Sequence, residues 1–350
     1  MKIMYLTHVN WFWIFQRPQI LALLLEKDFD LTVYSKQVLF KPLVSKNNKK
    51  PQKLKTVVQL PKSNIFKIFK IINKLIYRNS IKKIFKYDAV WLCHPIQFSD
   101  IPTNYKGLVI YDCMDNYVPM VSKEIKEQVK TLERDLVKRA DIIFASSNYL
   151  QDYVLKDKTS YLVRNGYNCT KSSPPLETGI KKTYTIGYFG TIAEWFDFNL
   201  LENSLNIFDN VEYRLVGPNA ANYIGKKRLL LEGVVQHSEL GAKIKDYDAL
   251  IMPFVVNDII LAVDPVKLYE YISFGKCVIS VWYPEIDRFS PYVYFYRTQE
   301  EYMNLLTELI RTGFRPKYNE KQQIEFLKDN SWDARYKTIK NVLNDFKRKS

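Results

Sequence analysis

A lysine and a glutamate share one face of a predicted helix that begins near Asp264 and Pro265. Proline at a first helical position loses no hydrogen bond, and an aspartate before it can accept hydrogen bonds from the exposed N–H groups. Lys267 and Glu270 are three positions apart, so their side chains point to the same side of this helix. An ammonium beside a helix N-terminus suits phosphate groups, and a carboxylate can accept hydrogen bonds from two ribose hydroxyls. The pair therefore predicts a site for a nucleoside diphosphate; the alternative is an ordinary surface ion pair.

The residues around this pair predict a helix, a glycine and a buried strand in succession. Gly275 is expected to end the helix in a left-handed conformation, with Lys276 beside the negative helix end. The apolar run 277–281 then predicts a buried strand. Four apolar side chains of the helix are expected to face a sheet: Val266, Leu268, Tyr269 and Ile272. Such a unit is typical of α/β domains.

Further candidate side chains follow predicted strands at their carboxyl ends, where open parallel sheets bind ligands. In the first half of the chain these residues are His8, Trp11, Trp13 and Arg17 after strand 2–7, His94 after strand 88–93, and Asp112 and Asp115 at the end of strand 107–112. In the second half, the turn of Gly190 and Thr191 follows strand 185–189. Two domains facing each other would form a cleft from these loops.

Each of these residues also has a structural interpretation. A lone histidine after a strand is more often hydrogen bonded within the fold than a catalytic base, and Arg17 could pair with a structural partner. Trp11 and Trp13 could stack on a sugar or a lipid, or pack their loop. Two Asp-x-Asp triplets, at 28–30 and 246–248, precede strands and fit turns there, so we expect no metal site.

Alternating strands and helices predict two doubly wound parallel sheets. The first has strands at 2–7, 31–35, 88–93, 107–112 and 141–145, with helices from about Arg17 and over 122–139. The second has strands at 185–189, 211–216, 232–235, 249–252, 277–281 and 293–296, with a helix near 199–208. We therefore expect a first domain over 1–166, a linker over 167–183 and a second domain over 184–330. The last segment, 331–350, has helical spacing and could pack back on the first domain.

Composition limits the class of protein. With 350 residues, 47% of them hydrophobic, the chain can bury two cores. It has no uninterrupted run of about 18 apolar residues, and its first residues predict a strand rather than a signal peptide, so a cytoplasmic location is expected. The four cysteines form no Cys-x-x-Cys pair, which argues against a zinc site or a disulfide framework.

The net charge of +15 lies almost entirely in the first half. Residues 1–180 hold 29 Lys and Arg against 15 Asp and Glu, whereas 181–350 hold 23 against 22. The segment 31–87 contains fifteen basic residues and no acidic one. A surface this basic requires an anionic partner.

Residues 65–86 predict a basic amphipathic helix. Its apolar stripe is Ile65, Ile68, Phe69, Ile72, Leu75 and Ile76, and its basic side is Lys67, Lys70, Lys74, Arg78 and Lys82. Such a helix can lie in the headgroup plane of an anionic bilayer. The alternative is a surface helix that packs its apolar stripe on the core. Nucleic acid is disfavoured, because no recognition motif accompanies the charge.

Three segments resemble nucleotide-sugar-dependent glycosyltransferases of the GT-B type, particularly the family-four-like enzymes of teichuronic acid, capsule and other bacterial surface polysaccharides. They are Trp13-Ile-Phe-Gln-Arg-Pro-Gln-Ile-Leu-Ala22, Ile186-Gly-Tyr-Phe-Gly-Thr-Ile-Ala-Glu-Trp-Phe-Asp197 and Asp264-Pro-Val-Lys-Leu-Tyr-Glu-Tyr-Ile-Ser-Phe-Gly-Lys276. The resemblance implies two Rossmann-like domains facing across a cleft. It also implies that Glu270 holds the ribose, that Gly190 and Thr191 meet the diphosphate, and that Lys267 lies near the phosphates or the sugar.

The chain departs from the family at two positions. A second glutamate often stands eight residues before the ribose-binding one, but that position is Ala262. A basic pair often follows the glycine turn, but here the residues are Glu194 to Asp197. Neutralising the diphosphate would then fall to Lys267, to Arg17 or to backbone N–H groups. The resemblance implies a retaining reaction without a protein nucleophile; for an inverting reaction, Asp115 or Asp112 is the candidate base.

The function expected from the sequence is that of a hexosyltransferase-type enzyme at the inner face of the membrane. It would move a sugar from a UDP-sugar to a lipid-linked or growing surface glycan, with no metal or other cofactor. Alternatives are a nucleotide-sugar epimerase or a glycan phosphorylase of the same fold, and a non-catalytic basic scaffold that binds membrane or nucleic acid.

Overall fold

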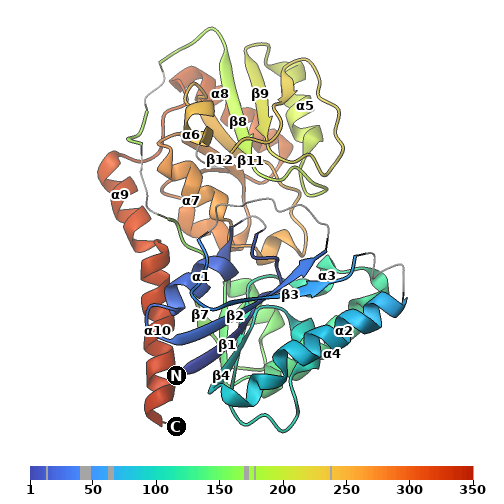
Figure 1. Ribbon diagram of the computed structural model, residues 1–350. Coiled ribbons are helices and arrows are strands. Elements are labelled where there is room, and N and C mark those ends of the chain that lie inside the picture. Colours follow the sequence, from blue (N-terminus) through green and yellow to red (C-terminus); the bar gives the residue numbers. More distant parts are fainter. Residues whose placement is uncertain are drawn as a thin grey trace. The chain divides into compact units, whose positions relative to one another are not determined.

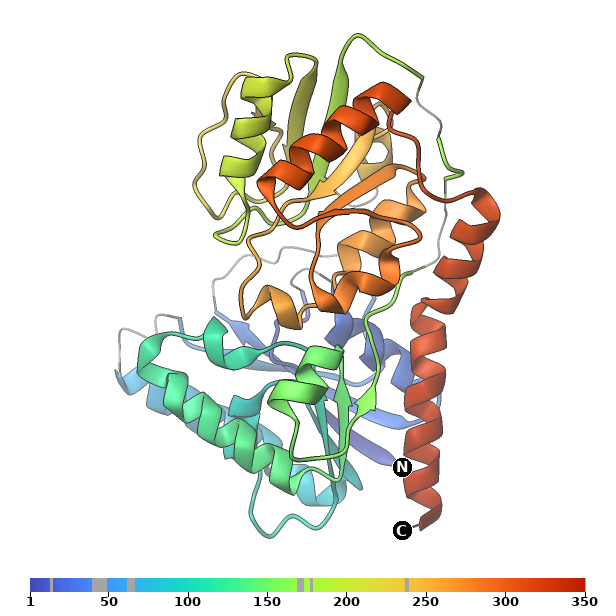
Figure 2. The same ribbon diagram turned by 180° about the vertical axis from the view of Figure 1, so that it is seen from behind.

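The computed structural model describes residues 1–12, 15–39, 49–61, 67–168, 173–176, 179–236 and 239–349. The chain divides into two units (Figures 1 and 2). Unit 1 contains Met1–Asn165 together with Trp332–Ser350, and unit 2 contains Gly166–Ser331. Each unit is built around one parallel sheet, which confirms the α/β fold class.

The sheet of unit 1 has the strand order β3-β2-β1-β4-β5-β6-β7, and all its neighbours pair in parallel. Its strands are β1 (Lys2–Leu6), β2 (Asp30–Val38), β3 (Leu54–Gln59), β4 (Ala89–Leu92), β5 (Leu108–Cys113), β6 (Ile142–Ala145) and β7 (Tyr161–Leu162). The order reverses between β1 and β4. In a doubly wound sheet this reversal opens a crevice at the carboxyl ends of the two strands.

Helices cover both faces of this sheet. They are α1 (Arg17–Leu25), α2 (Lys67–Ile81), α3 (Tyr117–Met120), α4 (Lys123–Arg139) and α10 (Trp332–Lys349), with the short turns η1 (Lys82–Lys86), η2 (Pro95–Asp100) and η3 (Leu150–Val154). Side chains alternate between the two faces of the sheet along β5. Tyr111 therefore binds Glu133 of α4 on one face, and Asp112 binds Arg17 of α1 on the other. The last helix, α10, runs alongside α1 and buries Trp332, Ile339 and Leu343 in the core of unit 1 (Figure 1).

Unit 2 repeats the architecture with the strand order β10-β9-β8-β11-β12-β13. Its strands are β8 (Tyr184–Phe189), β9 (Val211–Val216), β10 (Leu229–Leu231), β11 (Ala249–Met252), β12 (Cys277–Val281) and β13 (Tyr294–Tyr296). Its helices are α5 (Phe198–Ile207), α6 (Leu240–Lys243), α7 (Val266–Ser273), α8 (Gln299–Thr312) and α9 (Glu320–Asp329), with turns η5 (Ile260–Ala262) and η6 (Pro284–Phe289). Tyr213 of β9 is hydrogen bonded to Ser204 of α5 and to Tyr302 of α8, so these two helices share a face. Helix α7 covers the other face (Figures 1 and 2).

The structure corrects the predicted elements at three places. Strands β3 and β7 were not predicted; β3 lies in the basic segment, where lysines interrupt the apolar pattern. A strand predicted over 232–235 is wrong, because β10 ends at Leu231 and Gly233 follows with a φ of +72°. The Gly233 carbonyl instead accepts a hydrogen bond from Gly217 at 2.7 Å, which joins two loops at the carboxyl edge of the sheet.

Within the described ranges, the structure contains no helix that is long and apolar enough to cross a membrane.

Candidate functional site

The turn after β8 brings the backbone of Gly190 against Lys267. Gly190 has a φ of +135°, and a Cβ atom there would lie 2.2 Å from Cε and 2.9 Å from Nζ of Lys267. Gly217, after the neighbouring strand β9, has a φ of +140°, and a Cβ atom there would lie 2.0 Å from the Gly190 carbonyl oxygen. Both positions therefore require glycine, for conformation and for space. The close approach of two loops and a lysine builds the centre of the candidate donor site.

Lys267 is not part of an ordinary surface ion pair. Its side chain is half-buried, and its Nζ lies 5.8 Å from the centroid of the Tyr188 ring. Burial lowers the pKa of Lys267, and the Glu270 carboxylate partly offsets this by raising it. A partly desolvated ammonium group beside a glycine turn is suited to binding an anionic ligand. The geometry thus favours the ligand-site interpretation of the lysine.

Glu270 and Thr191 complete this group. Glu270 is half-buried one helical turn along α7, on the same side as Lys267. Thr191 is half-buried, and its carbonyl accepts a hydrogen bond of 2.8 Å from the Tyr188 hydroxyl, which fixes the turn after Gly190. Four predicted donor-binding residues therefore share the region where β8 ends and α7 begins.

The beginning of α7 differs from the prediction. Pro265 is the residue before the helix rather than its first residue. Asp264 is only 2% exposed, and its carboxylate accepts hydrogen bonds from Arg288 and, at 3.2 Å, from the Tyr269 hydroxyl. The Arg288 guanidinium also donates to Tyr269 at 2.7 Å. Asp264 therefore ties the start of α7 to η6, which positions the helix.

The far end of α7 follows the prediction more closely. Gly275 is left-handed with a φ of +67°, and β12 begins two residues later, as expected. Lys276 is held differently: its Nζ donates to the carbonyls of Lys245 at 2.6 Å and Tyr247 at 2.8 Å, which lie before β11. Val266, the first residue of the helix, is 38% exposed, so the prediction that it faces the sheet is wrong.

In unit 1, two histidines and a tyrosine meet at the carboxyl ends of β1, β4 and β5. The ring centroids of His8 and His94 are 5.8 Å apart, and those of His94 and Tyr117 are 4.3 Å apart. Tyr117 donates its hydroxyl to the Cys93 carbonyl at 2.7 Å, which holds the ring in place. The switch point of the sheet thus brings together the two histidines that the sequence predicted separately.

Both histidines are neutral at pH 7. Burial lowers the pKa of His8 to about 4. Burial lowers the pKa of His94 to about 3, with His8 and Lys36 adding to the shift. The Nδ1 atom of His94 accepts a hydrogen bond from the Ile96 N–H at 3.1 Å, so the single proton of the neutral ring belongs on Nε2. His94 can therefore donate one hydrogen bond through Nε2–H. The Nδ1 atom of His8 has no hydrogen-bond partner among the described residues and is a second polar atom at this place.

Asp112 and Arg17 form a buried ion pair. The Arg17 guanidinium donates through Nε at 3.1 Å to both carboxylate oxygens of Asp112 and through its terminal nitrogen at 2.7 Å. It also donates to the Val163 carbonyl at 2.7 Å. Asp112 has no exposed surface and Arg17 is 5% exposed. This enclosed pair joins α1 to β5, which favours the structural interpretation of both residues over a base and a phosphate ligand.

Asp115 is the better candidate for a base. It lies two residues after β5 and is half-buried, and its side chain forms no hydrogen bond among the described residues. Burial raises the pKa of Asp115 to about 7, with Arg17 lowering it and Asp112 raising it. A carboxyl group that titrates near neutral pH can accept a proton from a hydroxyl group and release it again.

Trp11 packs its loop, one of the two roles that the sequence left open. It has no exposed surface, and its indole N–H donates to the Lys49 carbonyl at 3.0 Å. It therefore offers no face to a sugar or a lipid. Trp13 lies outside the described residues.

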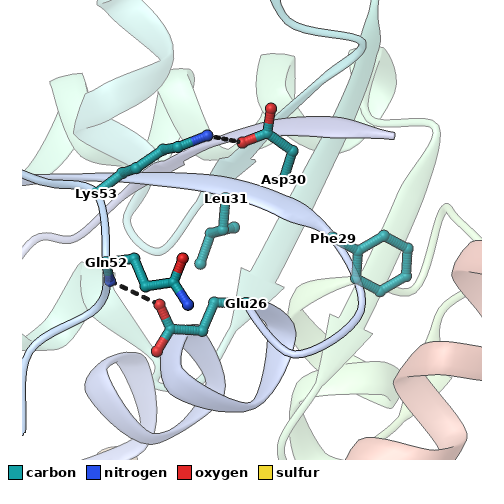
Figure 3. Close-up of a pocket in the computed structure, with 6 residues that line it drawn as sticks. All are labelled: Glu26, Phe29, Asp30, Leu31, Gln52 and Lys53. Carbon is teal, nitrogen blue, oxygen red and sulfur yellow. Dashed lines mark hydrogen bonds and ion pairs between the residues drawn. The ribbon is translucent and has the colours of Figure 1, made fainter.

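The Asp-x-Asp triplets hold structural contacts. Asp28 accepts hydrogen bonds at 2.7 Å from Tyr336 and from Lys340 of α10, and Asp248 accepts from the Thr185 N–H at 2.9 Å. Asp30 is bound by Lys53 at one wall of a cavity of about 260 Å³ (Figure 3). That cavity lies at the amino end of β2, whereas the candidate site residues of unit 1 follow carboxyl ends.

The amphipathic helix presents much of its apolar stripe to solvent. Ile68, Leu75 and Ile76 of α2 are 58%, 61% and 37% exposed. The residues that α2 buries, among those whose side chains are described, are Asn73, Tyr77 and Ile81. Phe69 and Ile72 of the stripe are half-buried, so the alternative in which the stripe packs on the core holds for only part of the described helix. Ile65 and the side chains of Lys67 and Lys70 lie outside what the structure describes.

Comparison with known proteins places this geometry in a fold. No family model matches the chain. Over 215 residues it is 27% identical to TuaH of Bacillus subtilis (strain 168), which is assigned as a teichuronic acid biosynthesis glycosyltransferase. The match covers 54% of each chain, so the chain spans about half the length of this curated relative.

Two solved structures match over nearly the whole chain. A sucrose-phosphate synthase of Thermosynechococcus elongatus is 12% identical with a TM-score of 0.74, covering 100% of both chains. HepE of Anabaena, in complex with UDP and glucose, is 14% identical with a TM-score of 0.66, covering 98% of this chain and 99% of that one. The chain has the GT-B fold. This confirms the fold expected from the resemblance.

Two residues of this GT-B chain were missed from the sequence. Arg288, which holds Asp264, lies 24 positions away in a turn without a motif, so no local pattern could have connected them. Tyr117 lies close to Asp115, and its position after a predicted strand was a usable signal. Both act through contacts that only the folded sheet creates.

Proposed function

We propose that this protein is a glycosyltransferase that takes its sugar from a UDP donor. The observation that carries the proposal is the contact of Lys267 with the Gly190 turn, with Glu270 one helical turn further on. Its GT-B fold is shared with HepE, which was solved with UDP and glucose, and the curated relative is assigned as a glycosyltransferase. The donor would place its diphosphate against the Gly190 and Thr191 turn and its ribose against Glu270.

The chemistry requires stabilising the departing UDP while an acceptor hydroxyl attacks the sugar. Lys267 is the cation of the donor group, and a diphosphate beside it would restore the charged form that burial disfavours. No metal enters this proposal, because the lysine and backbone N–H groups supply the positive charge. Arg17 is not assigned to the diphosphate, because Asp112 already binds its guanidinium.

Two groups could accept the proton that the acceptor hydroxyl loses. In a retaining reaction, which the family resemblance favours, an oxygen of the leaving diphosphate takes the proton. In an inverting reaction, Asp115 takes it, since its pKa of about 7 suits a base at neutral pH. His94, with its donor Nε2–H, would orient a hydroxyl group of the sugar or the acceptor.

The acceptor is proposed to be a lipid-linked or growing surface glycan at the cytoplasmic face of an anionic membrane. Support comes from helix α2, whose exposed Ile68, Ile71 and Leu75 are followed by the basic Arg78 and Lys82. Apolar side chains that enter the headgroup region and lysines that meet anionic lipids are the two contributions such binding needs. The assignment of the curated relative to teichuronic acid biosynthesis agrees with a surface glycan as product.

The decisive experiment measures UDP and UDP-sugar binding by calorimetry. We expect saturable binding to the wild-type protein and loss of at least about tenfold in affinity for Glu270→Ala, the scale of a hydrogen bond to a charged group. A scaffold would bind no nucleotide at all. An epimerase would convert UDP-N-acetylglucosamine to its 2-epimer without an acceptor, which proton NMR of the same mixture detects.

A further inference from the structure

Tyr188 of β8 contacts the candidate donor group, although the sequence gave no sign of such a role. The side chain has no exposed surface, and its ring packs edge-on against Phe196 and Phe254 with centroids 4.9 Å and 6.1 Å away. A Cβ atom at Gly190 would lie 3.1 Å from the Tyr188 hydroxyl and 2.2 Å from Cε of Lys267. The tyrosine and the lysine therefore flank the same bare stretch of backbone.

The hydrogen bonds of this turn leave one backbone N–H group free. The Gly190 N–H donates to the Val216 carbonyl at 2.9 Å. The Ile192 N–H donates to the Pro218 carbonyl at 2.9 Å. The N–H of Thr191, between these two, has no hydrogen-bond partner among the described residues. A free backbone N–H close to an ammonium group is suited to an anionic oxygen.

Two contacts fix the direction of this N–H. The Gly190 carbonyl is directed at Gly217, where a Cβ atom would lie 2.0 Å from its oxygen. Because the peptide is trans, the Thr191 N–H points to the opposite side. The Thr191 carbonyl accepts the hydrogen bond of 2.8 Å from the Tyr188 hydroxyl, and burial raises the pKa of this hydroxyl, so it keeps its proton. In the described ranges, Tyr188 is the one side chain that is hydrogen bonded to the Thr191 backbone.

We propose that Tyr188 is a positioning residue of the donor site, whose hydroxyl holds the Thr191 backbone so that its N–H and the Lys267 ammonium bind the same diphosphate. The inference rests on the proposed function, because it requires a nucleoside diphosphate at this place. It extends that function by assigning part of the donor affinity to a side chain that does not touch the donor. Since Tyr188 is fully buried, it acts through Thr191 and not by contact.

Tyr188→Phe tests the proposal, because it removes the hydroxyl and keeps the ring that packs on Phe196 and Phe254. We expect the variant to bind UDP about three- to tenfold more weakly than the wild type in calorimetry, the scale of one hydrogen bond. Uridine, which has no phosphates, should bind equally to both proteins in a saturation-transfer NMR titration. Equal UDP affinity in Tyr188→Phe overturns the proposal, and so does a loss of uridine affinity that parallels the loss for UDP.

Tyr213→Phe is the matched control for a general loss of stability. Tyr213 is also buried in unit 2, and its hydroxyl is hydrogen bonded at 2.7 Å to the hydroxyls of Ser204 and Tyr302. This variant loses two hydrogen bonds, so it should lower the melting temperature at least as much as Tyr188→Phe while keeping the wild-type affinity for UDP. A similar fall in UDP affinity in both variants overturns the proposal.

The wild-type titration separates this inference from the proposed function. If the wild type does not bind UDP, the donor site itself is refuted, and the role of Tyr188 is refuted with it. If the wild type binds UDP and Tyr188→Phe binds it equally well, the donor site stands and this inference alone is refuted.

Discussion

Replacing Lys267 by methionine separates a ligand role from a structural one. Methionine keeps most of the length and the apolar stem and removes the ammonium that lies against Gly190. Because burial lowers the pKa of Lys267, the folded protein holds this cation unfavourably, so the free variant should melt no lower than the wild type. A charge-assisted hydrogen bond contributes about 1.5–3 kcal/mol, so UDP affinity should fall by about 10- to 150-fold. Opposite directions for stability and binding are the signature of a binding residue.

The assay is calorimetric titration of UDP together with a thermal melt of the free protein. Lys182→Met is the matched control, since this lysine is exposed in the same unit, and it should change neither measurement. Equal UDP affinity in Lys267→Met refutes the assignment. A drop in melting temperature large enough to leave much of the variant unfolded would show that the lysine is structural.

The pH dependence provides an independent check of the same lysine. Its pKa is lowered in the folded protein, so the unfolded chain binds the proton more tightly. The free protein should therefore gain stability as pH rises from the folded pKa towards the ordinary value of 10.5. UDP affinity should fall over the same interval, whereas Lys267→Arg keeps its charge and should show no such fall. A parallel fall in both proteins would assign the effect to another group.

Three further predictions address unit 1. Asp115→Asn should lower turnover by roughly 100-fold with UDP affinity kept if the residue is the base, and the wild-type rate should rise with pH through about 7; near-normal turnover returns it to a structural role. Asp112→Ala leaves Arg17 buried without its carboxylate, so it should destabilise unit 1 by about 3–5 kcal/mol in chemical denaturation, and a further Arg17→Met change should recover part of that loss. Serine at both Ile71 and Leu75 should reduce sedimentation with phosphatidylglycerol vesicles without lowering the melting temperature, because both side chains are exposed; equal sedimentation excludes this face from membrane binding.

The alternation of apolar runs was sufficient to predict the fold class. Strands that are buried on both faces are continuous apolar segments, and ten of the thirteen strands in the described ranges lie at or near predicted positions. Of the three missed strands, β3 and β7 are short or interrupted by lysines and polar residues, so their pairing partners rather than their own composition define them. The strand predicted at 232–235 failed because Gly233 adopts a loop conformation that its neighbours in space require.

For the candidate donor site, the sequence by itself determined the residue types and their local spacing. Lys267 and Glu270 share a face because helical geometry is local, and Gly275 follows the helix in a left-handed conformation that glycine adopts without strain. These properties depend on a few consecutive residues.

Only the tertiary structure decided which of these residues meet. Gly190 and Lys267 are far apart in the chain, and Asp264 binds Arg288, which lies beyond β12. The same holds for Asp112, which Arg17 of α1 binds, and for α2, whose Ile68 and Leu75 are exposed because Asn73, Tyr77 and Ile81 occupy the packed side. Such contacts arise from the packing of distant segments, and the local sequence does not indicate which residue will be the partner.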